Sequence, residues 1–374
     1  MRVLIAPDDF KGTLSAVEAA EAIAIGWRLH APDDTLTLIP MSDGGPGFVR
    51  AVSTVLGGDI APVGLRGPMG ETAIGMVLMV DDTGYVESAH GCGLALVHPD
   101  RRDARAATSY GVGQLIAAAI DSGARRIVVG LGGTASTDGG AGMLAALGAT
   151  ARDAAGSPIA LEAGGAALAG VVTVDLAPAR ARVADVEIVV ASDVDSPLLG
   201  SRGAARGFAA QKGADDAAVE QLEAALTSYS RAIGRRADGK DPAVALGAGA
   251  GGGLGYGLML LGGRRVPGIE TVMGVLGLEA AIGVSDLVIT GEGCFDWQSL
   301  RGKVVSGVAA AALNQGRPVV VLAGRVEVGK REYVALGITE AHAASADGDV
   351  PATPAEAARA LAERAARVAS QWSR

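Results

Sequence analysis

Short apolar runs alternate with longer amphipathic stretches along much of the chain. The apolar runs predict strands at residues 2–6, 35–40, 60–65, 286–290, 318–322 and 338–342, and apolar positions at helical spacing predict helices at 15–30, 47–56, 301–314 and 353–370. At the start of the first helix, Ser15 and Glu18 have the spacing of a capping box, and Trp27 lies on its apolar face. This alternation predicts a doubly wound parallel sheet with Trp27 in the core.

The middle of the chain has a different pattern. Residues 72–80 and 83–88 alternate around Asp81-Asp82, which is typical of an antiparallel hairpin, and glycine-rich loops follow it. We therefore expect an α/β fold in which a second α/β domain is inserted into a discontinuous Rossmann-like parallel-sheet domain. The expected boundaries are 1–72 and 286–374 for the Rossmann-like domain and 73–285 for the inserted domain, which carries the glycine-rich phosphate loops.

Composition excludes several classes of protein. Hydrophobic residues make up 49% of the 374 positions, and residues 246–263 carry no charge. Glycine is so frequent in that window that we expect a loop leading into a short helix, and no membrane span. No secretory signal precedes Pro7, which predicts a cytoplasmic protein. The net charge of −9 and the aromatic content of 3% argue against a nucleic-acid-binding surface. Because the whole chain is negatively charged, local cations must attract any anionic substrate.

Cysteine and histidine usage predicts neither disulfides nor a cysteine-histidine metal site. The chain has two cysteines, Cys92 and Cys294, and four scattered histidines. Their spacing matches no metal-ligand pattern, and we expect both thiols to be reduced.

Residues 130–142, GLGGTASTDGGAG, directly follow the apolar run 126–129. Glycines let backbone N–H groups converge on an anion, and the helix expected from Gly140 favours negative charge at its N-terminus. The stretch fits neither the dinucleotide fingerprint nor the Walker A pattern. A tight strand-to-helix turn that simply needs glycine is the alternative, with Asp138 as the cap of the following helix.

Comparable loops recur after other predicted strands. Each places a carboxylate just past an apolar run, at 8–12, 42–45, 192–195 and 291–296. Ligands of α/β proteins bind at the carboxyl ends of parallel strands, so these loops are best interpreted as parts of one cleft.

Seven ordered segments together resemble the bacterial glycerate kinase family. They are APDDFKGTLSA (6–16), SDGGPGF (42–48), GLGGTASTDGGAGM (130–143), SDVDSPLLG (192–200), QKGA (211–214), GAGAGGGLGYG (247–257) and ITGEGCFDWQSLRGK (289–303). The resemblance implies phosphorylation of D-glycerate by ATP with Mg²⁺, usually on the 2-hydroxyl, in a cleft between two domains.

Phosphoryl transfer needs cations, aligned donors and a group that orients the attacking hydroxyl, and we assign candidates for each. The catalytic candidates are Asp193, Lys11 and Lys303, and the substrate-binding candidates are Asp8, Asp43, Gly44 and Gly45. The nucleotide phosphates are assigned to Gly132, Gly133, Thr134, Ser136, Thr137, Gly251 and Gly252. Asp296 and Glu292 are the metal candidates, although the roles of Asp193 and Asp296 are exchangeable. The alternatives are a hinge at 249–253 and a solvated surface position for Lys11.

The segments depart from the family pattern at Pro46, Ser196, Cys294 and Phe295. These departures leave two alternatives open. One is a kinase of another small hydroxy acid or sugar acid, and the other is a non-catalytic nucleotide or metabolite sensor. We expect a monomer or homodimer whose partner is the small anionic substrate, glycerate.

Overall fold

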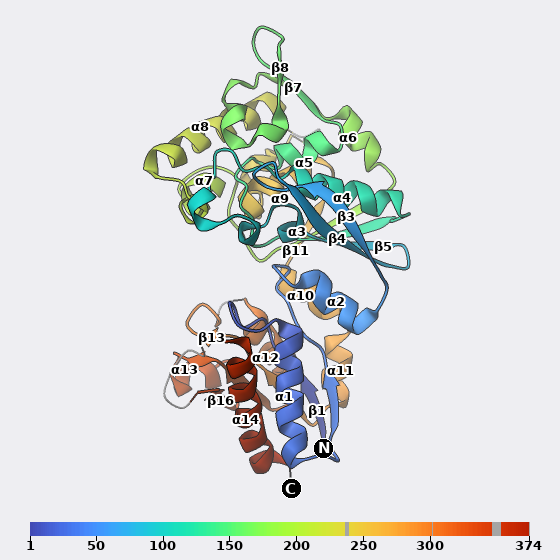
Figure 1. Ribbon diagram of the computed structural model, residues 1–374, viewed down its shortest axis with the longest axis vertical. Coiled ribbons are helices and arrows are strands. Elements are labelled where there is room, and N and C mark those ends of the chain that lie inside the picture. Colours follow the sequence, from blue (N-terminus) through green and yellow to red (C-terminus); the bar gives the residue numbers. More distant parts are fainter. Residues whose placement is uncertain (236–238, 301, 346–352, 374) are drawn as a thin grey trace. The chain divides into compact units, whose positions relative to one another are not determined.

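The structure is a computed structural model that describes residues 1–235, 239–300, 302–345 and 353–373 (Figure 1). The chain forms two compact α/β units. Unit 1 comprises Met1–Asp43, Arg50–Gly57 and Gly268–Arg374, and unit 2 comprises Gly44–Val49 and Gly58–Pro267. Unit 1 is therefore discontinuous in the sequence, and most of unit 2 lies between its first and last segments.

Unit 1 is built on a five-stranded sheet whose neighbouring strands pair in parallel, in the order β16-β14-β12-β1-β2. Counted along the chain, this is the order 2-1-3-4-5, so the direction of winding reverses between β1 and β12. Ligands of such sheets bind beyond the carboxyl ends of the strands at that reversal. The strands are β1 (Arg2–Ile5), β2 (Thr35–Leu38), β12 (Leu287–Thr290), β14 (Val319–Ala323) and β16 (Glu340–Ala343), with a small separate pair β13 (Cys294–Phe295) and β15 (Arg325–Val326).

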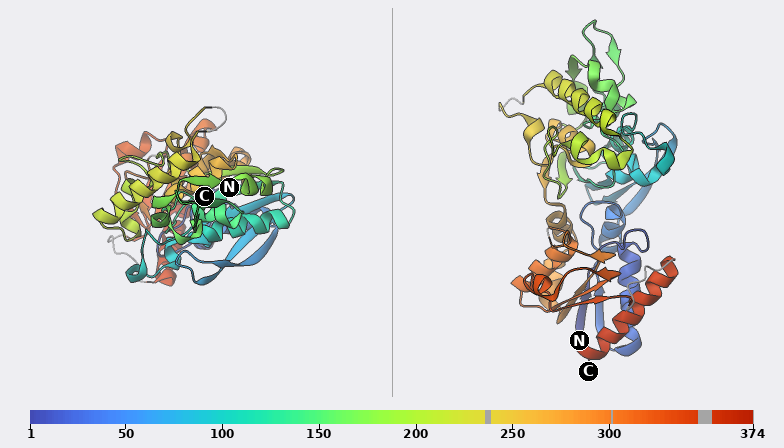
Figure 2. Two further views of the ribbon diagram at one scale, coloured as in Figure 1. Left: turned by 90° about the horizontal axis from the view of Figure 1, so that it is seen from above. Right: turned by 90° about the vertical axis from the view of Figure 1, so that its left-hand side faces the viewer.

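Helices cover both faces of this sheet (Figure 2, right). α1 (Ala16–His30) and α14 (Pro354–Trp372) pack together on the face that carries Val3 and Ile5, whereas α11 (Leu278–Val284) and α12 (Val304–Asn314) contact β1, β12 and β14. The predicted capping box is present, since the Ser15 N–H donates to the Glu18 carboxylate at 2.8 Å and the Glu18 N–H donates to Ser15 Oγ at 3.3 Å. The remaining helices are α2 (Phe48–Leu56), α10 (Gly268–Val275) and α13 (Lys330–Val334).

Trp27 is fully buried on α1, as predicted, and its indole N–H donates to Asp34 at 2.9 Å. A buried indole whose only polar atom is bonded adds a large apolar surface to the core without a desolvation cost.

Unit 2 contains a six-stranded mixed sheet in the order β11-β10-β6-β5-β4-β3. β4 and β5 form the predicted antiparallel hairpin, and β5, β6, β10 and β11 are parallel. The strands are β3 (Asp59–Arg66), β4 (Thr72–Val80), β5 (Thr83–Glu87), β6 (Arg126–Gly130), β10 (Glu187–Ala191) and β11 (Arg264–Val266), and β7 (Thr150–Arg152), β8 (Pro158–Ile159) and β9 (Thr173–Asp175) form a small sheet. The helices are α3 (Ser88–Cys92), α4 (Tyr110–Asp121), α5 (Ala141–Ala146), α6 (Ala177–Arg182), α7 (Ala204–Phe208), α8 (Asp216–Ile233) and α9 (Ala250–Leu260).

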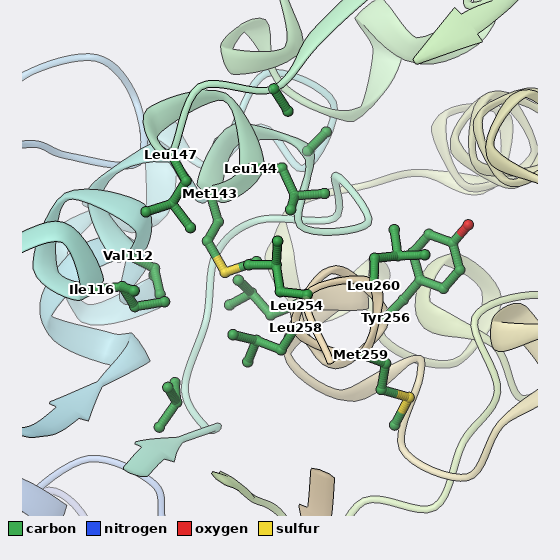
Figure 3. Packing of buried hydrophobic residues seen from close by; sticks show 14 of the residues in the cluster. Val112, Ile116, Met143, Leu144, Leu147, Leu254, Tyr256, Leu258, Met259 and Leu260 are labelled. Carbon is green, nitrogen blue, oxygen red and sulfur yellow. The ribbon is translucent and has the colours of Figure 1, made fainter. Parts of the chain in front are cut away.

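The core of unit 2 holds the glycine-rich segments in place. Figure 3 shows Met143 of α5 between Val112 of α4 and Leu254 of α9, and these side chains are fully buried. Full burial of such a side chain stabilises the fold by roughly 1.5–3 kcal/mol. The packing therefore fixes the loop before α5 and the start of α9 relative to each other.

The uncharged window 246–263 forms a loop followed by α9, as predicted. Gly251, Gly252 and Gly253 have left-handed backbone conformations with φ of +60°, +71° and +95°, and regular helix begins after them. Among the described residues, no helix combines the length and apolar character that crossing a membrane requires. Both cysteines are free thiols, as predicted, with Cys92 buried and Cys294 half-buried.

Two segments differ from the sequence expectation. The strand at 60–65 was expected beside the first sheet, but β3 pairs with β4 in unit 2 through a tight turn in which Gly67 N–H donates to Glu71 O at 2.7 Å. Alternation fixes which face of a strand is apolar but not which sheet it joins. Residues 268–284, expected in the inserted segment, form α10 and α11, and α11 contacts β1 in unit 1.

Candidate active site

Unit 1 has a pocket of about 370 Å³ at the reversal of its sheet. The segments that follow β1 and β12 stay paired for a few residues, since Ala6 N–H donates to Ile289 O at 2.7 Å and Asp8 N–H donates to Gly291 O at 2.8 Å. Beyond these hydrogen bonds the two loops diverge and line the pocket. The acidic and basic side chains that line it are Asp8, Asp9, Lys11, Asp43, Glu292, Asp296, Lys303 and Arg325. We call it the unit 1 pocket.

Negative charge dominates the unit 1 pocket. Burial, and then the charges of Asp43 and Asp9, raise the pKa of Asp8 well above its ordinary value. Burial likewise raises the pKa of Glu292, although Lys303 opposes that shift. Carboxylates crowded in this way favour a proton, a cation or a hydroxyl donor between them.

Two lysines balance part of this charge. Lys11 is exposed on the loop after β1, and Lys303 is the half-buried residue that precedes α12, as its sequence position predicted. Lys303 therefore adds its charge to the positive end of the helix dipole, a position suited to a phosphate. Both lysines line the unit 1 pocket with the acidic residues.

Asp296 is held by its own loop. Its Oδ1 accepts hydrogen bonds from Gln298 N–H at 2.7 Å and from Ser299 N–H at 3.3 Å, and these bonds fix the orientation of the carboxylate. Glu292 lies at the end of β12, where Gly324 N–H donates to its backbone oxygen at 3.0 Å. Asp296 and Glu292 thus approach the unit 1 pocket from one loop.

The donor set fits Mg²⁺. Glu292 is 7% exposed, and its Oε1 is buried without a hydrogen-bond partner among the described residues. The described residues contain no group of three His, Cys, Asp or Glu side chains arranged around a metal. Mg²⁺ commonly binds through one or two carboxylates together with waters and substrate phosphates, so Glu292 and Asp296 would suffice as protein ligands if the ion binds here.

Two charged residues of the unit 1 pocket were not among the candidates. Asp9 adjoins Asp8, and Arg325 follows β14 by two positions and pairs with Glu327 at 3.2 Å. Arg325 follows the carboxyl end of a predicted strand, which was the available signal for it.

In unit 2, three loops converge at the carboxyl ends of β5, β6 and β10. A Cβ added to Gly130 would lie 2.4 Å from the backbone oxygen of Gly44, and one added to Gly132 would lie 2.5 Å from Gly45 Cα. The predicted substrate loop at 44–47 therefore packs directly on the predicted phosphate loop. Glycine is required at these positions because any side chain would separate the two backbones.

These loops lie near a second pocket of about 280 Å³, which we call the unit 2 pocket. Five of the nucleotide candidates line it, namely Gly132, Gly133, Thr134, Gly251 and Gly252. The buried side chain of Lys212, which was not a candidate, lines it as well.

The other residues of the glycine-rich loop are buried beneath the unit 2 pocket and do not line it. Ser136 Oγ lies 3.6 Å from Cys92 Sγ, and Thr137 Oγ1 is buried with no hydrogen-bond partner in the part of the chain that the structure describes. Asp138 accepts hydrogen bonds from the N–H groups of Gly140 and Gly142 at 3.1 and 3.2 Å, and from Ser109. The N-cap of α5 is Gly140, and Asp138 bonds the start of the helix from two positions before it, so the expected capping by Asp138 is met only in part.

The loop after β10 carries Asp193 and Asp195. Asp193 is half-buried in unit 2, whereas Lys11 and Lys303 belong to unit 1. Asp195 is exposed and forms an ion pair with Arg265 at 2.6 Å. The spacing of Asp193 and Asp195 also suggests that both carboxylates share one face of an extended loop, but Arg265 already pairs with Asp195.

Comparison with known proteins identifies the family. The profile of the Glycerate kinase family matches residues 3–373. The chain belongs to the glycerate kinase family. It is 42% identical to glycerate 2-kinase of Escherichia coli strain K12 over 87% of this chain and 85% of that protein. It is 38% identical to glycerate kinase of Bacillus subtilis strain 168 over 98% of this chain and 96% of that protein.

A solved structure supports the same assignment. A protein assigned as glycerate kinase 2 from Salmonella typhimurium LT2 superposes with a TM-score of 0.84 and 36% sequence identity, covering 100% of this chain and 98% of that one. The predicted resemblance, the α/β fold class and the enzyme class, a phosphotransferase of the glycerate kinase family, are thereby confirmed.

Proposed function

We propose that this glycerate kinase transfers the terminal phosphoryl group of ATP to the 2-hydroxyl of D-glycerate, with Mg²⁺, in the cytoplasm. The observation that carries the proposal is the unit 1 pocket, where carboxylates and lysines meet at the reversal of a parallel sheet. The family match and the name of the Escherichia coli relative, glycerate 2-kinase, support the substrate and the position phosphorylated.

Each candidate has a role in this proposal. Asp8 and Asp43 accept hydrogen bonds from the glycerate hydroxyls, and the loop with Gly44 and Gly45 contributes backbone groups. Lys11 and Lys303 neutralise the glycerate carboxylate and the phosphoryl group in transfer. Such charge stabilisation supplies most of the catalysis in phosphoryl transfer.

The bond changes are those of an in-line displacement. The glycerate hydroxyl oxygen forms a bond to the terminal phosphorus, the bond from that phosphorus to the bridging oxygen breaks, and ADP leaves with that oxygen. The hydroxyl proton passes to the Asp193 carboxylate. Mg²⁺, held by Glu292 and Asp296, would neutralise charge on the nucleotide phosphates.

The first experiment incubates the purified protein with ATP, Mg²⁺ and D-glycerate, and follows ADP release and the product by phosphorus NMR. We expect 2-phosphoglycerate. A 3-phospho product would overturn the assigned position, and absence of any product from D-glycerate would overturn the substrate. Asp193→Ala tests the base separately, because an unchanged kcat in that variant would eliminate its role.

A second substrate class has one observation in its favour. Among the departures from the family pattern, Cys294 lines the unit 1 pocket, whereas Phe295 is buried away from it against Tyr333. The family resemblance implies a basic residue at position 294, so the thiol there leaves less positive charge for a carboxylate. A panel of small hydroxy acids and sugar acids, compared by kcat/KM, decides between D-glycerate and another acid.

A further inference from the structure

Lys212 is a buried cation that forms no ion pair with any residue in the described part of the chain. It is 3% exposed at the end of a short turn after α7, and its Nζ donates to Ser136 O at 2.5 Å and to Thr134 Oγ1 at 3.3 Å. No carboxylate of a described residue lies within 4 Å of it. Both of its acceptors are neutral, so one ammonium proton has no acceptor among the described residues.

Burial of an unpaired charge is costly, and the structure shows the expected effect. Burial lowers the pKa of Lys212 to about 8, although Cys92 and Asp138 oppose this shift. Neither neighbour bonds to it directly: burial raises the pKa of the Cys92 thiol to about 12, and the Asp138 carboxylate accepts its hydrogen bonds from Ser109, Gly140 and Gly142. A lysine kept in such a place is typical of a site that an anion completes.

The surroundings of Lys212 are built for an oxyanion. Lys212 lines the unit 2 pocket together with Thr134, Gly251 and Gly252. A Cβ added to Gly252 would lie 2.8 Å from Lys212 Nζ and 1.9 Å from Ser136 O, so glycine lets the backbone approach the ammonium group. Successive glycines in left-handed conformation direct backbone N–H groups into a concave surface that binds phosphate.

We propose that Lys212 is the cation of a phosphate site in unit 2, where it holds a phosphate group of the nucleotide that donates the phosphoryl group. The inference rests on the proposed use of a nucleotide, and it adds a binding residue from the segment QKGA, for which no role was predicted. We expect the site to take a polyphosphate rather than the glycerate carboxylate. Its volume of about 280 Å³ and the several glycines that line it match a group with many oxygens.

Calorimetric titration of the full-length protein with inorganic tripolyphosphate, ATP and D-glycerate tests the site. Lys212→Met should weaken tripolyphosphate and ATP binding by at least about tenfold, as expected for loss of a charge-assisted hydrogen bond, and leave D-glycerate binding unchanged. Lys330→Met is the matched control, since Lys330 is exposed in unit 1 and its loss changes the net charge equally. Equal affinities of wild type and Lys212→Met for ATP would overturn the proposal, as would loss of D-glycerate binding alone.

A measurement on the wild type covers the case in which Lys212→Met does not fold. ATP affinity without metal should fall by up to about tenfold per pH unit above the Lys212 pKa, between about pH 8 and 9.5. The titratable groups that face Lys212 are Cys92 and Asp138. Burial raises the pKa of the Cys92 thiol to about 12, above this range, and it also raises the pKa of Asp138. A purely structural lysine predicts no such dependence, and a flat affinity would refute the phosphate site.

The two proposals fail in different ways. If the wild type phosphorylates D-glycerate and Lys212→Met retains full ATP affinity, only the phosphate site is wrong. If the wild type binds tripolyphosphate through Lys212 but phosphorylates no acid, the proposed reaction is wrong and the phosphate site stands.

Discussion

The Glu87 carboxylate accepts a hydrogen bond from the backbone N–H of Gly47 at 3.1 Å, and its second oxygen accepts one from Val49 N–H at 3.2 Å. Glu87 is the last residue of β5 and is 3% exposed. It therefore fixes the loop that carries Gly44 and Gly45 to the carboxyl edge of the unit 2 sheet.

Replacing Glu87 should loosen that loop. Glu87→Ala removes the acceptor of two N–H groups, and each buried donor left without a partner costs about 1–3 kcal/mol. We expect a lower melting temperature and a KM for D-glycerate raised by more than about fivefold, with a smaller change in kcat. Glu21→Ala, at an exposed position on α1, is the control. An unchanged KM in Glu87→Ala would show that the loop does not position substrate.

Asp8→Asn should raise the stability of the protein and lower its activity. The raised pKa of Asp8 means that the folded protein holds a proton on this group that the unfolded chain releases, so its contribution to stability falls as pH rises from about 4 through the folded pKa. Asparagine removes the unfavourable free energy of the buried charge. The variant should therefore melt about 2–4 °C higher at pH 7 for each kcal/mol removed, and it should melt at the same temperature as the wild type below about pH 4. Its kcat/KM should fall at least about a hundredfold. Thermal melts across pH, with steady-state kinetics, check both expectations, and a lower melting temperature at pH 7 would contradict the first.

Gly252→Ala should disrupt the unit 2 pocket. The added methyl group would lie 1.9 Å from Ser136 O, at a backbone φ of +71° that residues other than glycine rarely adopt. We expect lower stability and loss of measurable ATP binding by calorimetry. Gly274→Ala is the matched control, because a Cβ there meets nothing within 4 Å and alanine stabilises a helix by up to about 1 kcal/mol relative to glycine. Normal ATP affinity in Gly252→Ala would count against a nucleotide site at these glycines.

Lys303→Met should reduce catalysis without unfolding the protein. The lysine charge lies at the N-terminus of α12, where it opposes the helix dipole, so its removal should not lower the melting temperature. We expect kcat to fall at least about a hundredfold, with the Lys330→Met variant unchanged. Activity within threefold of wild type would remove Lys303 from the proposed catalytic group.

The candidate residues of unit 1 could be found from the sequence because one rule covers them. Asp8, Lys11, Glu292 and Asp296 all follow apolar runs, and parallel strands bring their carboxyl ends to one edge. Lys212 follows no strand, and it reaches Ser136 across 76 positions of the chain only through the packing of α7 and α9. Residue patterns encode local structure, whereas a contact of that range depends on tertiary packing. The ion pair of Asp195 with Arg265 was missed for the same reason. β3 and β4 are neighbours in the sequence, and their pairing was missed because alternation does not specify which sheet a strand joins.

The division of unit 1 in the sequence has a consequence for synthesis of the protein on the ribosome. α14, which packs on α1, is made after more than three hundred other residues, and β12, β14 and β16 are also late. Most of unit 2 is contiguous and can fold while the first strands still lack their neighbours. Until translation nears its end, β1 and β2 expose apolar edges with no sheet to join, so this nascent segment is where chaperone binding and misassembly should concentrate.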